Sequence, residues 1–121
     1  MKNVVLIIEN DDDILDLLSE IVFHLDLEVE ARRDIIPLFE LETLNPSLIL
    51  LDHWLDDSTG ADYCMELKTN PSTSHIPVVM VSAMNALSEL SSNANADAYI
   101  AKPFDLDHLE HVVQRFIPSV K

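Results

Sequence analysis

Polar side chains stand at the ends of four short apolar runs of the sequence. Glu9 and Asn10 follow the first run, Asp52 ends another, Ser82 ends a third, and Lys102 follows a shorter fourth. Crowded carboxylates repel one another and favour a hard divalent cation, and oxygen ligands of this kind suit Mg²⁺. A carboxylate beside such a cation can attack phosphorus and form an aspartyl phosphate, whose oxygens a metal, an ammonium and a hydroxyl then neutralise or hydrogen-bond. If these side chains meet, they form a pocket for a phosphoryl group.

The apolar runs that precede these side chains have the pattern of buried parallel strands. They are short and continuous rather than alternating between apolar and polar residues. The expected strands are residues 4–8, a weak strand over 28–31, and further strands over 47–52, 77–82 and 98–101.

Helical periodicity separates these runs. The first predicted helix has apolar residues at spacings of three and four from Ile14 to Leu25, after aspartates that suit a helix N-terminus. A short helix that carries Leu38, Phe39, Leu41 and Leu44 is predicted to be capped by Asp34, with Pro37 in its first turn. Two further helices are expected over 59–68 and from an Asp105 cap to Phe116.

The order of these elements determines where the polar side chains meet. Strand and helix alternate five times, which predicts an α/β fold: a doubly wound, five-stranded parallel sheet with helices on both faces. One domain over residues 1–121 is expected. In such sheets ligands bind outside the carboxyl ends of the strands, which is where all the polar residues above are placed.

Composition and charge exclude several classes of protein. The chain has 121 residues, 48% of them hydrophobic, which suffices for one folded domain. Its net charge of −15 would repel nucleic acid and anionic lipid surfaces. No apolar run approaches the roughly 18 residues of a membrane span, or the core of a signal peptide. We expect a cytoplasmic protein that binds neither nucleic acid nor membrane.

Other devices for phosphate, redox or metal chemistry are also excluded. Gly60 is the only glycine, so a Walker A loop and a dinucleotide fingerprint are both absent. Cys64 has no partner for a disulfide and is interpreted as a small core side chain. The five histidines lack the spacing of a zinc site and are interpreted as structural.

The chain resembles the receiver domain of bacterial response regulators over nearly its whole length. The resemblance is carried by LIIENDDDILDLL, PSLILLDHWLDDSTGADYCMELK, SHIPVVMVSA and ADAYIAKPFDLDHL, in the family's order and close to its spacing. It implies a flavodoxin-like receiver fold and a phosphoacceptor signalling role in a two-component system or phosphorelay. It implies that the protein is not an enzyme, apart from Mg²⁺-dependent self-phosphorylation and self-dephosphorylation.

The resemblance also implies a role for each site residue. Asp52 would be the phosphoacceptor, and Mg²⁺ would be bound by Glu9, Asn10, Asp52 and the backbone carbonyl of Trp54. Ser82 would be the switch hydroxyl and Tyr99 the aromatic residue that reorients on activation. Lys102 would bind the phosphoryl group and, at rest, pair with Asp52. The phosphodonor would be a histidine kinase or histidine phosphotransfer protein, the output a downstream protein target, and the resting state a monomer.

Some positions match the family in detail and others depart from it. Lys102–Pro103 resembles the family's cis peptide, and Gly60 lies where only glycine is tolerated. Asn10 stands where the family usually has an aspartate ligand, so we expect weaker binding of Mg²⁺, with Asp11 compensating through water. Asp56 replaces a common proline, and Asn95 replaces a glycine that requires a left-handed conformation.

The chain also departs beside the phosphoacceptor. Trp54 and Met84 are bulky and offer no group to orient an attacking water, which predicts slow hydrolysis of an aspartyl phosphate.

Alternative interpretations remain open at several of these positions. Asn10 motivates a degenerate receiver that acts as a phosphorylation-independent interaction module. A flavodoxin-like cofactor carrier is disfavoured, because the acidic loop after the first strand would repel the phosphate of FMN. Tyr99 could be a core residue of an edge strand, and the chain could be a stand-alone receiver or a fragment of a longer regulator.

Overall fold

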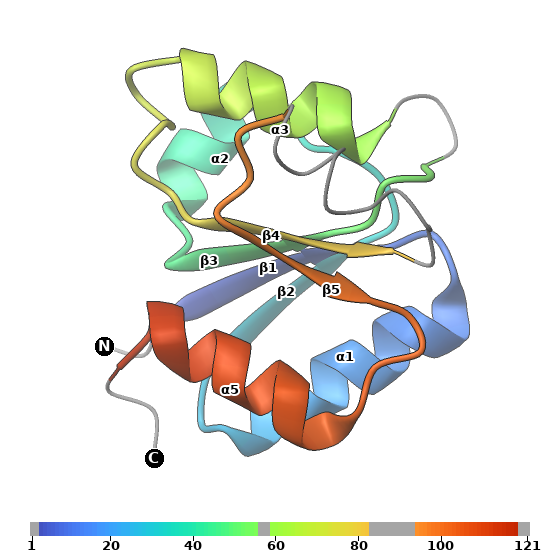
Figure 1. Ribbon diagram of the computed structural model, residues 1–121. Coiled ribbons are helices and arrows are strands. Elements are labelled where there is room, and N and C mark those ends of the chain that lie inside the picture. Colours follow the sequence, from blue (N-terminus) through green and yellow to red (C-terminus); the bar gives the residue numbers. More distant parts are fainter. Residues whose placement is uncertain (1–2, 56–58, 83–93, 119–121) are drawn as a thin grey trace.

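The computed structural model describes residues 3–55, 59–82 and 94–118 and shows a parallel sheet between two layers of helices (Figure 1). The strands are β1 (Val4–Ile8), β2 (Glu28–Arg32), β3 (Leu48–Leu51), β4 (Val78–Ser82) and β5 (Ala98–Ala101). The helices are α1 (Asp12–His24), α2 (Leu38–Leu44), α3 (Gly60–Thr69) and α5 (Leu106–Phe116). Residues 83–93, between β4 and β5, lie outside the described residues.

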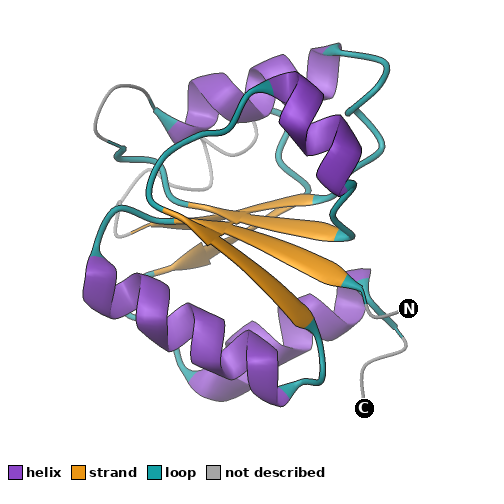
Figure 2. Ribbon diagram, turned by 180° about the vertical axis from the view of Figure 1, so that it is seen from behind, coloured by secondary structure: helices purple, strands orange, loops and turns teal. Residues whose placement is uncertain are grey.

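The sheet has the strand order β2-β1-β3-β4-β5, and every pair of neighbours is parallel. Helices α1 and α5 cover one face, and α2 and α3 cover the other (Figure 2). This arrangement confirms the predicted doubly wound α/β fold. Because every strand runs the same way, all carboxyl ends lie along one edge of the sheet.

The core consists of two apolar layers separated by the sheet. Val5 and Ile7 of β1 pack with α1 and α5, whereas Leu6 and Ile8 pack with α2 and α3. This alternation follows from the two-residue period of a strand. The central strands β1, β3 and β4 are almost wholly buried, and the edge strands β2 and β5 are partly exposed. Continuous apolar runs therefore mark the central strands, which hold the site.

The start of α2 differs from the prediction. The helix begins at Leu38 with Pro37 at its N-cap, in an extended conformation with φ −61° and ψ 151°. Asp34 does not cap the helix, because its carboxylate accepts a hydrogen bond from the neighbouring Ile35 N–H. A proline disfavours helical backbone at the residue before it, which agrees with a helix that excludes Ile36 and begins after the proline.

Three other local predictions are confirmed. Asn95 is left-handed, with φ 62°, and the Lys102–Pro103 peptide is cis. Cys64 is fully buried in the layer beneath α2 and α3. In the described ranges, no helix is both long and apolar enough to cross a bilayer.

Candidate functional site

The carboxyl ends of β1, β3, β4 and β5 bring four of the predicted residues to one place. Ile8 of β1 is in register with Leu51 of β3, so Glu9 and Asp52 leave the sheet side by side. The Asp52 N–H donates to the Ile8 carbonyl at 2.9 Å, and the Lys102 N–H donates to the Ser82 carbonyl at 3.1 Å. Glu9, Asp52 and Ser82 are each at most 5% exposed. Polar side chains buried to this degree require partners.

Lys102 supplies the positive charge at this cluster. Its Nζ lies 2.5 Å from Glu9 Oε1 and 3.6 Å from Asp52 Oδ1. The expected pairing with Asp52 is therefore present, and a closer pairing with Glu9 accompanies it. One ammonium between two carboxylates leaves the cluster with a net negative charge.

The buried carboxylates perturb each other. Burial first, and then the charge of Glu9, raise the pKa of Asp52 to about 6, although Lys102 and the main-chain N–H of His53 oppose the rise. Burial and a like charge both penalise the ionised carboxylate. A cation placed against Asp52 and Glu9 would remove much of that penalty.

The donor set suits Mg²⁺. Glu9 and Asp52 offer carboxylate oxygens, and Mg²⁺ typically binds one or two carboxylates and retains several waters. Within the described ranges, no three histidine, cysteine, aspartate or glutamate side chains converge as a metal site. A metal here would accordingly rely on water and on neutral oxygens such as those of Asn10 and Trp54.

The loop after β1 is ordered by its own hydrogen bonds. Asp11 caps α1, because its Oδ1 accepts from the N–H groups of Asp13 and Ile14. The Asp11 N–H in turn donates to Glu9 Oε2 at 3.1 Å. The Asp11 carboxylate is thus occupied at the helix terminus, which does not support its compensating for Asn10 at the metal.

Comparison with known proteins agrees with this geometry. A model of the response regulator receiver domain matches residues 5–114. The chain belongs to the receiver-domain family. Receivers are signalling domains rather than classical enzymes, and this one is accordingly a receiver domain of two-component signalling.

Relatives of this receiver include a histidine kinase and a transcriptional regulator. It is 30% identical over 107 residues to histidine kinase P4 of Formosa agariphila and 32% identical over 108 residues to the DNA-binding regulator RpaA of Synechocystis. Each alignment covers 87% of the chain, but only 8% of the kinase and 45% of RpaA. The chain thus spans less than half the length of either protein.

Solved structures share the fold of this receiver. The receiver domain of the sensor histidine kinase PA1611 from Pseudomonas aeruginosa, which has a magnesium ion coordinated in its active-site cleft, has a TM-score of 0.86 at 24% identity. The match covers 98% of this chain and 100% of that one. The receiver domain of NtrX from Brucella abortus has a TM-score of 0.82 at 29% identity, over 95% and 98% of the two chains.

Gly60 of the receiver brings α3 close to the backbone at the end of β3. A Cβ at this position would lie 2.1 Å from the main-chain oxygen of Asp52 and 3.0 Å from the Cα of His53. The Gly60 N–H also donates to the His53 carbonyl at 2.7 Å. Glycine is therefore required here for this close approach and not for a left-handed conformation, since no glycine has a positive φ.

His53 is a site residue that the sequence did not reveal. It is 6% exposed, and its ring nitrogen Nδ1 accepts a long hydrogen bond of 3.4 Å from the Ala61 N–H in the first turn of α3. Its ring also meets Trp54 edge-on, with 4.5 Å between centroids. Burial lowers the pKa of His53, which favours the neutral ring that can accept this bond. A lone histidine after a strand carries no signal of such contacts.

The remaining predicted residues are less enclosed. Trp54 is 57% exposed and Tyr99 is 47% exposed, so Tyr99 is not a core residue of its edge strand. Asp56 and Met84 lie outside the described residues.

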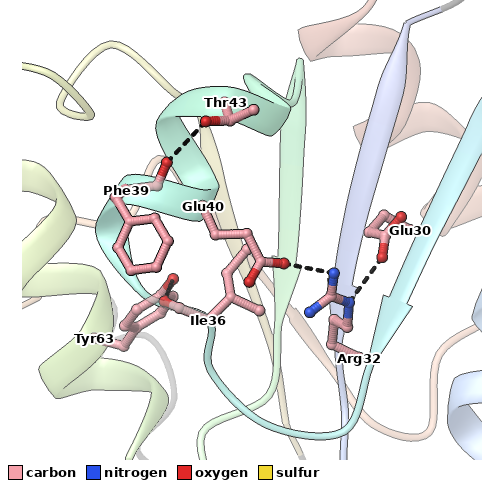
Figure 3. A network of polar contacts seen from close by, with 7 residues as sticks. All are labelled: Glu30, Arg32, Ile36, Phe39, Glu40, Thr43 and Tyr63. Carbon is pink, nitrogen blue, oxygen red and sulfur yellow. Dashed lines mark hydrogen bonds and ion pairs between the residues drawn. The ribbon is translucent and has the colours of Figure 1, made fainter.

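A second polar network braces the loop between β2 and α2 (Figure 3). Arg32 Nε lies 2.7 Å from Glu30 and its Nη2 lies 2.6 Å from Glu40. The Tyr63 hydroxyl donates to the Ile36 carbonyl at 2.7 Å. These contacts fix the chain that follows the carboxyl end of β2, next to the loop that carries Glu9.

Proposed function

We propose that Asp52 is the phosphoacceptor of a two-component or phosphorelay receiver. The observation that carries this proposal is the buried cluster in which Asp52 lies beside Glu9 and Lys102 at the carboxyl edge of the sheet. The donor would be a phosphohistidine of a histidine kinase or phosphotransfer protein. The phosphorus–nitrogen bond of the donor breaks as an oxygen of Asp52 bonds to phosphorus, and the imidazole leaves with the electron pair.

The chain's own residues prepare Asp52 for this step. The main-chain N–H of His53 binds the carboxylate, and the turn at Gly60 packs against the backbone of Asp52, so that the nucleophile is held in one position. Bound Mg²⁺ would neutralise charge on the phosphoryl oxygens, with Glu9, Asn10, Asp52 and the Trp54 carbonyl as its ligands.

The negative charge that the phosphoryl group adds at Asp52 would drive the change to the active conformation. The ammonium of Lys102 is a compact charge on a flexible stem, so it can move from Glu9 to a new phosphoryl group without rebuilding the site. Ser82, buried at the end of β4, would hydrogen-bond the same group, and Tyr99 on β5 would transmit the change to a downstream protein target.

The proposal is tested by phosphorylation with acetyl phosphate and Mg²⁺, followed by intact-protein mass measurement. A single gain of one phosphoryl group is expected, and Asp52→Asn should abolish it. A gain that persists in Asp52→Asn would show that another residue accepts the phosphoryl group.

The competing function is a degenerate receiver that binds its partner without phosphorylation. Asn10 favours it, because a neutral amide in place of a carboxylate weakens attraction for a dication. The absence of any mass gain in both the native protein and Asn10→Asp would support this function. A gain in Asn10→Asp alone would show that Asn10 is the cause of the loss.

A further inference from the structure

Arg33 places a second cation at the edge of the site. It directly follows β2, and its Nη2 donates to the main-chain carbonyl of Asn10 at 3.0 Å. Its Nη1 lies 3.3 Å from Asp12 Oδ1. The guanidinium therefore holds the loop that carries Glu9 and Asn10 from the outer side, while Lys102 holds Glu9 from the inner side.

The ion pair between Arg33 and Asp12 contributes little to the free energy of folding. The side chains of Arg33 and Asp12 are 58% and 68% exposed, and exposed ion pairs of this kind stabilise proteins by at most about 1 kcal/mol. Arg33 can accordingly be replaced without loss of the fold. Its charge, in contrast, is permanent, because a guanidinium does not lose its proton in proteins.

That charge acts on any cation in the site. Asn10 is adjacent in sequence to Glu9, and the guanidinium is bound to the Asn10 carbonyl, so it lies well within the roughly 10 Å over which charges interact at moderate salt. A single positive charge repels a divalent ion twice as strongly as it repels a monovalent one. A guanidinium at this place would therefore weaken the attraction of this acidic loop for Mg²⁺, as would the neutral amide of Asn10.

We propose that Arg33 sets the Mg²⁺ affinity of the receiver by lowering it from the rim of the site. This rests on the proposed function only in taking Glu9 and Asp52 as the metal ligands. The consequence is a site whose loading with Mg²⁺, and hence whose readiness for phosphorylation, depends on the cation concentration around it.

The test is a Mg²⁺ titration of the full chain at about 20 mM ionic strength. Binding is monitored by Trp54 fluorescence and by calorimetry. Arg33→Gln, which keeps a hydrogen-bond donor and loses the charge, should tighten Mg²⁺ binding about threefold. Arg33→Lys keeps the charge and should bind Mg²⁺ as the native protein does. The gain in Arg33→Gln should shrink towards nothing in 0.5 M KCl, where charges are screened within a few ångströms.

The matched control removes the same charge elsewhere. Arg115 lies in the last turn of α5, beside the first residues of β5. This strand is at the other end of the strand order from β2, which Arg33 follows. Arg115→Gln should leave Mg²⁺ affinity within about 1.5-fold of native, because its charge is screened over that separation. An equal gain in both variants would indicate net charge alone and would overturn the assignment to Arg33.

Two other results separate this inference from the proposed function. Unchanged or weaker Mg²⁺ binding in Arg33→Gln, with binding to the native protein intact, would refute the role of Arg33 alone. No Mg²⁺ binding by the native protein and Asn10→Asp would instead refute the metal site on which the proposed function depends.

Discussion

Asp52 is held in a place that disfavours its own charge. Its pKa is raised from 3.8 to about 6, first by burial and then by Glu9. The folded protein therefore binds a proton there more readily than the unfolded chain does. Its contribution to stability is present below about pH 3.8 and is lost as the pH rises through about 6.

Asp52→Asn is consequently expected to stabilise the metal-free protein at pH 7.5. The gain in the free energy of unfolding should be on the order of 2 kcal/mol, because the amide is neutral at every pH. Urea unfolding in EDTA measures it, and the difference between variant and native should shrink as the pH falls from 7.5 to 4. A difference that stays constant over this range would contradict the raised pKa.

A substitution of Lys102 tests the opposing effect on the pKa of Asp52. Its charge lowers the pKa of Asp52, so Lys102→Met should raise that pKa above about 6. Carboxyl-carbon NMR titration of labelled aspartate reports the change directly. Lys68→Met, which removes an ammonium at the other edge of the sheet, is the matched control and should leave the Asp52 titration where it is.

Gly60 gives a steric prediction at one atom. An added Cβ would lie 2.1 Å from the Asp52 carbonyl oxygen, which belongs to the backbone and cannot rotate away. Gly60→Ala should lower the free energy of unfolding by about 1–3 kcal/mol, as overpacking does, and should slow phosphorylation because Asp52 moves. The neighbouring Ala61→Gly should cost about 1 kcal/mol without slowing phosphorylation. Equal phosphorylation rates in all three proteins would show that the contact does not position Asp52.

At the scale of elements, periodicity and strand pattern were sufficient to predict the sheet. Four apolar runs ended at polar residues, and parallel pairing of these strands brought Glu9, Asp52 and Lys102 together. The start of α2 was wrong because a capping aspartate at Asp34 was given more weight than the backbone restriction imposed by Pro37. The roles of His53 and Arg33 could not be predicted from the sequence. Each role depends on a contact with a distant segment, the first turn of α3 for His53 and the loop after β1 for Arg33.

An ion pair between Lys68 and the partly exposed Asp97 joins three segments at the amino-terminal ends of β4 and β5. Lys68 near the end of α3 lies 2.7 Å from Asp97, which also accepts from the Val78 N–H at the start of β4. Lys68 Nζ donates to the Ile76 carbonyl as well. Removing Asp97 leaves the ammonium of Lys68 without its counter-ion.

Asp97→Ala is expected to destabilise the receiver by about 1–3 kcal/mol, because Val78 and Lys68 both lose a charged hydrogen-bond partner. Chemical unfolding measures the loss, and native-state hydrogen exchange should locate it at the amides around Val78. Asp107→Ala, on the exposed first turn of α5, is the control and should cost less than about 1 kcal/mol. Losses of equal size in the two variants would mean that the contacts of Asp97 with Lys68 and Val78 add nothing specific to stability.

At the scale of the whole molecule, the distribution of charge couples stability to the ionic surroundings. Residues 1–66 contain 17 acidic and 3 basic residues, whereas residues 67–121 contain 5 and 4. Repulsion among these charges destabilises the compact state and is relieved by screening. If Mg²⁺ binds as proposed, a magnesium salt would have two effects on the stability of this receiver: a general one through screening and a specific one through binding at Glu9 and Asp52.

The two effects separate when ionic strength is held constant. With KCl replaced by MgCl₂ at equal ionic strength, the native protein should become more stable in proportion to RT ln(1 + [Mg²⁺]/Kd), because the folded state alone presents Glu9 and Asp52 together. At 10 mM Mg²⁺ and a Kd of about 1 mM, this amounts to about 1.4 kcal/mol. Asp52→Asn should respond to KCl as the native protein does but gain much less from Mg²⁺, since one buried carboxylate is gone. Equal gains from Mg²⁺ in the two proteins would place the cation elsewhere on the acidic surface and remove Asp52 from its ligands.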